Sequence, residues 1–130
     1  MKGTMEFKNI TFDKDSKTFT IKNGSKGTYP YADIVNCMIA NDDAKFKGKD
    51  EPFKHTVLSG MFQMTMFTNK YVYVGVIFEM RNHQKVYVYV SDEKTPIQTL
   101  QYHKDRRNAE TIKEFAKRII HKYNPKISTT

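Results

Sequence analysis

Residues 70–91 read KYVYVGVIFEMRNHQKVYVYVS and predict two β-strands that fold back on each other. Successive side chains of a strand point to opposite faces, so the valines, Phe78 and Met80 share one face. The other face carries Tyr71, Tyr73, Ile77, Glu79, Tyr87 and Tyr89. Keeping valine opposite valine requires an odd loop or a bulge, most simply the three residues Asn82-His83-Gln84. The pairs expected from that loop are Met80–Val86, Phe78–Val88 and Val76–Val90.

Further short strands are expected on both sides of this hairpin, because apolar and β-branched residues alternate between turn signals. Asn23-Gly24 marks one such turn, and Pro30 belongs at an edge or a bulge since it cannot donate to a strand ladder. With the hairpin, the chain should contain about seven antiparallel strands. Those outside the hairpin are expected over 5–13, 18–21, 28–40, 56–67 and 97–102, where 35–40 continues the run that begins at Thr28.

One amphipathic helix is expected near the C-terminus, where the apolar period changes from 2 to 3.6 residues. Asn108 is the candidate N-cap, and Asn124-Pro125 should end the helix. The fold class is therefore mainly β (α+β), with the helix covering one face or opening of the strands. Its apolar stripe consists of Ala109, Ile112, Phe115, Ala116, Ile119, Ile120 and Tyr123.

The length of 130 residues and the lack of a linker or repeat predict a single domain over 1–130. Residues 41–55, dense in charge and carrying Gly48 and Pro52, should form an exposed excursion. Cys37 is the only cysteine, which excludes a disulfide within the chain and favours a buried thiol. The sequence shows no signal peptide and no apolar run near the ~18 residues of a membrane span, so we expect a cytoplasmic protein.

Two stretches resemble pleckstrin-homology-like domains, especially the small bacterial ones. They are YPYADI, where a tyrosine-rich strand leads into Asp33-Ile34, and the closing NAETIKEFAKRIIHKYN. The resemblance implies a bent antiparallel barrel of two near-orthogonal sheets, capped at one open end by the helix. Lipid-binding members carry a basic pattern with arginine in the first hairpin loop. Here that loop is Asp13-Lys14-Asp15-Ser16-Lys17, with two acids and no arginine, and Phe115 stands in for the usual helix tryptophan.

The tyrosine face of the hairpin is a candidate for protein contact, because aromatic rings with polar tips are typical of interfaces. The alternative is that another segment of the chain covers these rings. The leading hypothesis is a non-enzymatic binding module that contacts another protein or assembles with itself. The candidate contact residues are Tyr71, Tyr73, Tyr87 and Tyr89.

Basic residues suggest a second hypothesis, an electrostatic adaptor for acidic membrane lipids or nucleic acid. The chain has 22 basic and 14 acidic residues, and residues 70–130 carry +6 of the +8 net charge. A solvated helix face that keeps the protein soluble is the alternative interpretation. The candidate anion-binding residues are Lys45, Lys47 and Lys49 in the excursion and Lys113, Lys117, Arg118 and Lys122 in the helix.

Residue patterns of catalysis and of metal or cofactor binding are missing from the sequence. The histidines, at 55, 83, 103 and 121, lack the spacing of a zinc helix, and no glycine-rich phosphate loop occurs. Ser59 lacks the two-glycine elbow of a serine hydrolase, and Cys37 lies inside an apolar run. We therefore expect no enzyme, no cofactor and no metal. A small-ligand carrier or enzyme with its site in the barrel mouth is a third hypothesis.

Overall fold

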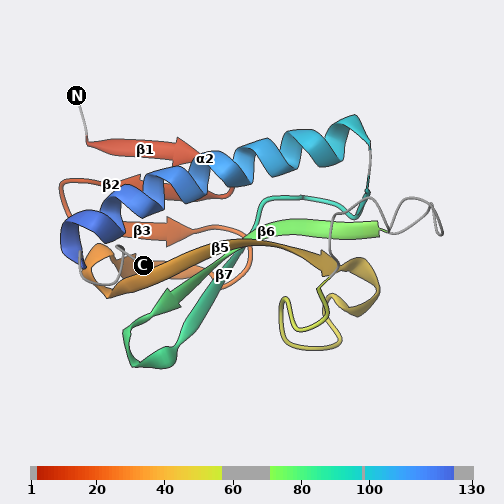
Figure 1. Cartoon of the computed structure of the whole chain (residues 1–130), viewed down its shortest axis with the longest axis horizontal. Helices are drawn as coiled ribbons and strands as arrows, with labels where there is room; N and C mark the ends of the chain where they lie inside the picture. The colour runs from red at the N-terminus through yellow and green to blue at the C-terminus, as the bar shows by residue number, and fades with distance from the viewer. Residues whose placement is uncertain (1–2, 57–70, 98, 125–130) are drawn as a thin grey trace.

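The computed structural model describes residues 3–56, 71–97 and 99–124, which form two antiparallel sheets and one long helix (Figure 1). The first sheet has the order β1-β2-β3-β4, and the second has β5-β6-β7 with β8 paired to the start of β6. The strands of the first sheet are β1 (Thr4–Phe7), β2 (Ile10–Asp13), β3 (Thr18–Ile21) and β4 (Gly27–Pro30). Those of the second are β5 (Ile34–Asp43), β6 (Tyr71–Met80), β7 (Lys85–Tyr89) and β8 (Thr95–Pro96). Three short 3-10 helices, η1 (Tyr31–Asp33), η2 (Ala44–Phe46) and η3 (Arg81–His83), and the helix α2 (Leu100–Tyr123) complete the fold.

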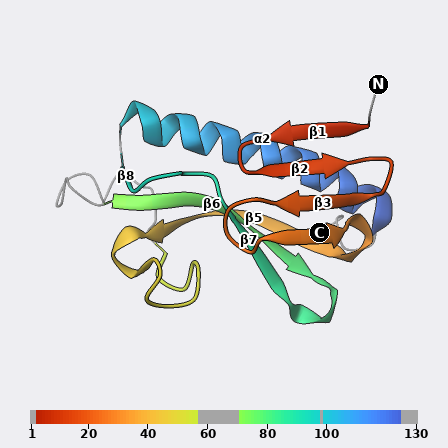
Figure 2. The ribbon, with the colours of Figure 1, turned by 180° about the vertical axis from the view of Figure 1, so that it is seen from behind.

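The mainly β fold with one C-terminal helix is confirmed, but the described strands do not close into the expected barrel. The two sheets meet where the turn after β3 pairs with β7, at the isolated bridge between Gly24 and Val88. Gly24 has φ +119°, and a Cβ atom there would lie 2.3 Å from the backbone oxygen of Tyr87, so only glycine fits this approach. The sheets thus form two layers joined at one corner (Figures 1 and 2).

The central hairpin has the predicted faces but a register shifted by two residues. Val76 pairs with Val88 and Phe78 with Val86, and the loop is Arg81-Asn82-His83 rather than residues 82–84. A two-residue shift keeps every side chain on its face, so alternation alone could not determine the register. Asn82 and His83 have φ of 53° and 66°, and this left-handed pair determines where the chain turns.

The apolar face of the hairpin lies in the main core, between the first sheet and α2. Ile112 is fully buried and Ile119 is 6% exposed, as the predicted stripe requires. Phe115 is half-buried, with its ring centroid 4.8 Å from that of Phe12 and 5.5 Å from that of Phe7. The helix therefore packs against the strands through the side that its periodicity predicts.

Three predicted strands are wrong as placed. The run that begins at Thr28 is divided by η1 into β4 and β5. The run 5–13 is split at Asn9 (φ 63°) into β1 and β2. Residues 100–102 of the expected last strand belong to α2, which begins at Leu100 with Thr99 as its N-cap, so Asn108 lies inside the helix. The expected strand over 56–67 falls almost wholly outside the described residues.

The expected exposed excursion at 41–55 is buried at both ends. Asn41, Asp42 and Asp43 continue β5 and are 7% exposed or less, and Phe53 is 7% exposed. The polar composition of this stretch predicts exposure, but its ends are buried because they bind residues that are far away in the sequence. Asn41, for example, donates to the hydroxyl of Tyr102 in α2 (3.1 Å).

Candidate functional site

The outer face of the second sheet, opposite the core, carries the predicted tyrosines. Residues paired directly across an antiparallel sheet share a face, so Met38, Ile77 and Tyr87 form one row across three strands. The next row is Ala40, Gly75 and Tyr89. We call this surface, made of the outward residues of β5, β6 and β7, the outer face.

Residues 44–55, which we call the strap, fold back over part of the outer face. In both ribbon views the strap (yellow) and α2 (blue) lie on opposite sides of β5 and β6 (Figures 1 and 2). Phe53 stacks on Tyr89 and Tyr87, with ring centroids 5.0 and 5.7 Å apart. The sequence-based alternative, tyrosines covered by another segment, therefore holds for part of this face.

Hydrogen bonds at the end of β5 hold the strap in place. The backbone N–H of Asp43 donates to the carbonyl of His55 (2.8 Å), and the Asp42 carboxylate accepts from the Tyr89 hydroxyl (3.0 Å). The backbone N–H of Phe53 donates to the same carboxylate. Burial raises the pKa of the Asp42 carboxyl, while these two hydrogen bonds act in the opposite direction.

Contacts within the strap give it its own shape. The rings of Phe46 and His55 stack with centroids 3.8 Å apart, and His55 Nε2 lies 2.9 Å from the Asp50 carboxylate. The hydrogen bond to His55 is the largest cause that lowers the pKa of the Asp50 carboxyl, and the hydrogen bond from the Glu51 N–H is the second. The strap is thus a folded segment that carries Phe53 to the sheet.

The four candidate contact tyrosines differ in their surroundings. Tyr89 is 5% exposed beneath Phe53, and Tyr73 and Tyr87 are half-buried beside it. Tyr71 is 40% exposed at the start of β6, where the Lys94 ammonium lies 5.2 Å from its ring. The structure therefore brings together Tyr73, Tyr87 and Tyr89 and leaves Tyr71 at the edge.

The candidate anion-binding residues fall into two separate groups. Lys45, Lys47 and Lys49 lie on the strap, which follows the end of β5. The helical group (Lys113, Lys117, Arg118 and Lys122) lies in the second half of α2, which ends where the Asn124 side chain donates to the Ile34 carbonyl at the start of β5. A ten-residue strand spans roughly 30 Å, so the two groups do not form one surface.

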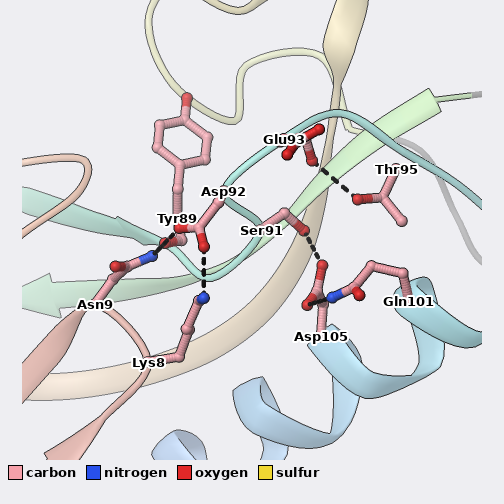
Figure 3. Close-up of polar contacts among 9 residues, drawn as sticks. All are labelled: Lys8, Asn9, Tyr89, Ser91, Asp92, Glu93, Thr95, Gln101 and Asp105. Carbon is pink, nitrogen blue, oxygen red and sulfur yellow. Dashed lines mark hydrogen bonds and ion pairs between the residues drawn. The ribbon is translucent and has the colours of Figure 1, made fainter.

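A polar cleft lies between the β1–β2 turn, residues 92–96 and the start of α2 (Figure 3). Its volume is about 570 Å³. Lys8 and Asn9 hold Asp92, and the hydrogen bond from Lys8 is the main cause that lowers the pKa of that carboxyl. The charges lining the cleft are mixed: Lys8, Lys94 and Lys104 against Asp92, Glu93 and Asp105.

Ser91 and Asp105 meet beside this cleft, but they are arranged for structure. The Ser91 hydroxyl donates to Asp105 (2.7 Å) and accepts from the Val74 N–H (2.9 Å), and Gln101 donates to Asp105 (2.8 Å) (Figure 3). Ser91 is 0% exposed, and the lining of the cleft includes no histidine. A nucleophilic serine needs an adjacent base and access to substrate, so this pair anchors α2 to β6.

The other groups with catalytic potential are dispersed or buried. Burial raises the pKa of the Cys37 thiol to about 12, which makes it a poor nucleophile. His83 lies in the hairpin loop, and His103 and His121 are exposed at opposite ends of α2. Among the described residues no cluster of histidine, cysteine and acidic side chains could hold a metal ion. In the same part of the chain no helix is long and apolar enough to cross a membrane.

Two features of the outer face were missed in the sequence. Phe53 lies in the charged excursion, where no local periodicity marks it. Gly75 interrupts a valine–tyrosine strand, and an isolated glycine in a strand is a known sign of close approach by another segment.

Comparisons with known proteins give no further identification: no family model, no curated protein and no solved structure matches the chain.

Proposed function

We propose that the chain is a non-enzymatic, pleckstrin-homology-like module that binds another polypeptide through its outer face. The observation that supports this most is that the outer face already holds a polypeptide segment. The strap places an aromatic side chain, Phe53, on Tyr87 and Tyr89 and is fixed to β5 by the main-chain hydrogen bond from Asp43 to His55. The strap thus indicates which kind of polypeptide the outer face can bind, namely a segment with an aromatic anchor and a basic residue.

The remaining part of the outer face offers room for such a segment. Met38 is 40% exposed, and Ile77 and Tyr87 continue its row toward Phe53. A hollow of about 380 Å³ lies at the hairpin end of the sheet, lined in part by Asn36 and Glu79. Met38 is thus an exposed apolar side chain beside aromatic rings, which favours contact with another chain over solvation.

Two experiments test this function. Sedimentation velocity over a range of protein concentrations measures self-association, and selection from a random peptide library finds peptides that the protein binds. Met38→Asp should weaken self-association or release the selected peptides. Met5→Asp is the matched control, because Met5 is 46% exposed on β1 in the other sheet. Concentration-dependent association that Met38→Asp removes identifies a second copy as the partner. A strict monomer that selects no peptide, or binding unaffected by Met38→Asp, overturns the proposal.

An electrostatic adaptor remains the second candidate function, through α2 alone. Lys117, Arg118 and Lys122 are exposed on the last turns of the helix, away from the strap. Sedimentation with vesicles that contain anionic lipid should then depend on salt and be lost in the double variant K117E/K122E. The strap variant K45E/K49E has the same charge change and should still bind. Equal loss in both variants would indicate a net-charge effect and count against a helix site.

The absence of catalysis and a cytoplasmic location are parts of the same proposal. The burial of Cys37 and Ser91 supports the first, since neither side chain can reach a substrate in this fold. The sole cysteine, buried and unpaired, suits a reducing compartment and supports the second. Fractionation of the native host would test the location directly.

A further inference from the structure

Two tyrosine rings of the outer face hold the ammonium group of Lys47. Its Nζ atom lies 5.0 Å from the ring centroid of Tyr73 and 4.9 Å from that of Tyr89. The two rings meet edge to face, with centroids 5.7 Å apart and an interplanar angle of 70°. A cation within about 6 Å of an aromatic ring is attracted by its negative face, so both rings bind this one cation.

An acidic group, the Asp42 carboxylate, lies at the hydroxyl end of one of these two rings. Asp42 pairs with Tyr73 across the sheet, and its carboxylate accepts the hydroxyl hydrogen of Tyr89. Asp42 is 2% exposed, so solvent screens its charge only weakly. By accepting from the Tyr89 hydroxyl, this carboxylate holds the Tyr89 ring in the position where Lys47 contacts it.

Lys47 itself is exposed and is held loosely enough to be exchanged. Its backbone is fixed as the C-cap of η2, where its N–H donates to the Ala44 carbonyl (3.3 Å), but its Nζ atom makes no ion pair with any described residue. A cation–π contact made by an exposed ammonium group is weak compared with a buried ion pair. A bound polypeptide with its own lysine could therefore displace Lys47 while the strap stays anchored through Phe53.

We propose that Tyr73 and Tyr89 form a cation site that Lys47 fills in the free protein, and that a lysine side chain of a bound polypeptide takes its place. This inference rests on the proposed function, because it names the chemical group that the polypeptide supplies. Lys47 thus acts as an internal competitor. Its removal should strengthen the binding of organic cations at this site.

A titration with tetramethylammonium chloride tests the site. The NMR signals of the Tyr73 and Tyr89 rings report the binding. Sodium chloride at equal ionic strength is the reference. In Lys47→Ala the apparent Kd should fall about fivefold or more below the wild-type value, because two ring contacts no longer compete. Lys47→Arg keeps a cation in place and should behave as wild type. Lys49→Ala, in the same strap, should also leave the Kd unchanged.

A further substitution separates the rings from the general charge of the surface. Tyr73→Leu introduced into Lys47→Ala should abolish the tetramethylammonium shifts at Tyr89. Equal Kd values for wild type and Lys47→Ala, or shifts that sodium chloride reproduces, overturn the cation site. If peptide selection or self-association through Met38 persists in that case, the proposed function stands and only this inference fails. Loss of both would remove the function as well.

Discussion

Phe53 rests directly on Gly75. A Cβ atom at Gly75 would lie 2.3 Å from the Phe53 Cζ atom and 2.5 Å from the backbone oxygen of Val88. Real Cβ atoms do not approach this closely, so the missing side chain makes room for the ring. The strap is therefore docked on the backbone of the central strand, and it divides the outer face into a covered and an open part.

Substitutions at Phe53 should show an unusual order of stability. Phe53 has φ +61°, a left-handed conformation that costs a residue with a side chain roughly 1 kcal/mol relative to glycine. Phe53→Gly should therefore be more stable than Phe53→Ala by about 1 kcal/mol, although both lose the ring. Urea unfolding of the two variants measures the difference. Phe53→Ala as the more stable variant would contradict the observed backbone conformation.

The start of α2 can be located by two alanine substitutions. The Thr99 side chain accepts from the Tyr102 N–H (3.1 Å), so Thr99→Ala should lower the free energy of unfolding by about 1 kcal/mol. Asn108 lies inside the helix, and Asn108→Ala should be neutral or stabilise slightly. Chemical denaturation gives both values. The reverse pattern would place the N-cap at Asn108, where the sequence predicts it.

Ser91 should matter for stability more than its size suggests. Ser91→Ala leaves the buried Val74 N–H and the buried Asp105 carboxylate each without one partner, which should cost about 1–3 kcal/mol. Ser16→Ala is the control, because Ser16 lies in the exposed turn before β3 and shares only one hydrogen bond with Thr18. Equal effects of the two substitutions on the urea midpoint would show that the buried contact is not formed.

The Cys37 thiol should stay neutral and unreactive in the folded protein. Burial raises its pKa to about 12 from an ordinary value of 9.0, so the unfolded chain releases this proton at lower pH than the folded chain. The thiol's contribution to stability is therefore lost as pH rises from about 9 to 12. Alkylation by iodoacetamide at pH 9 should be slow in buffer and accelerate through the urea transition. Alkylation in buffer at the rate of the unfolded chain would contradict burial.

Local patterns in the sequence predict the parts of the fold that depend on neighbouring residues. The valine face of β6 and the stripe from Ala109 to Tyr123 follow from periodicity, and both lie in the core. The first two turns of α2 could not be predicted in this way. Their inward positions include Asp105, whose burial depends on Ser91 and Gln101. An acidic residue in an apolar stripe looks like a solvent-facing position until its partners are known.

The position of the strap was the part of the fold least predictable from sequence, because contacts between residues that are far apart in the chain hold it. Phe53 is surrounded in sequence by Pro52 and Lys54, and its contacts with Gly75 and with the rings of Tyr87 and Tyr89 bury it. The tyrosines of the outer face were identified as a candidate surface, but the sequence could not show that the chain itself occupies part of it. The sequence places both basic groups in one electrostatic hypothesis, but it carries no information on their separation along β5.

The central claim, that the outer face binds a polypeptide with an aromatic anchor and a lysine, is tested most directly by supplying the strap as a separate peptide. A synthetic peptide of residues 44–55 is added to the Phe53→Gly variant, which lacks the ring that covers Tyr87 and Tyr89. The backbone amide signals of the variant are followed by NMR. The account predicts saturable shifts at Gly75 and Tyr89 that a scrambled peptide does not produce. No shift at these residues up to ~5 mM peptide, a concentration at which even weak association of about 3 kcal/mol is visible, would contradict it.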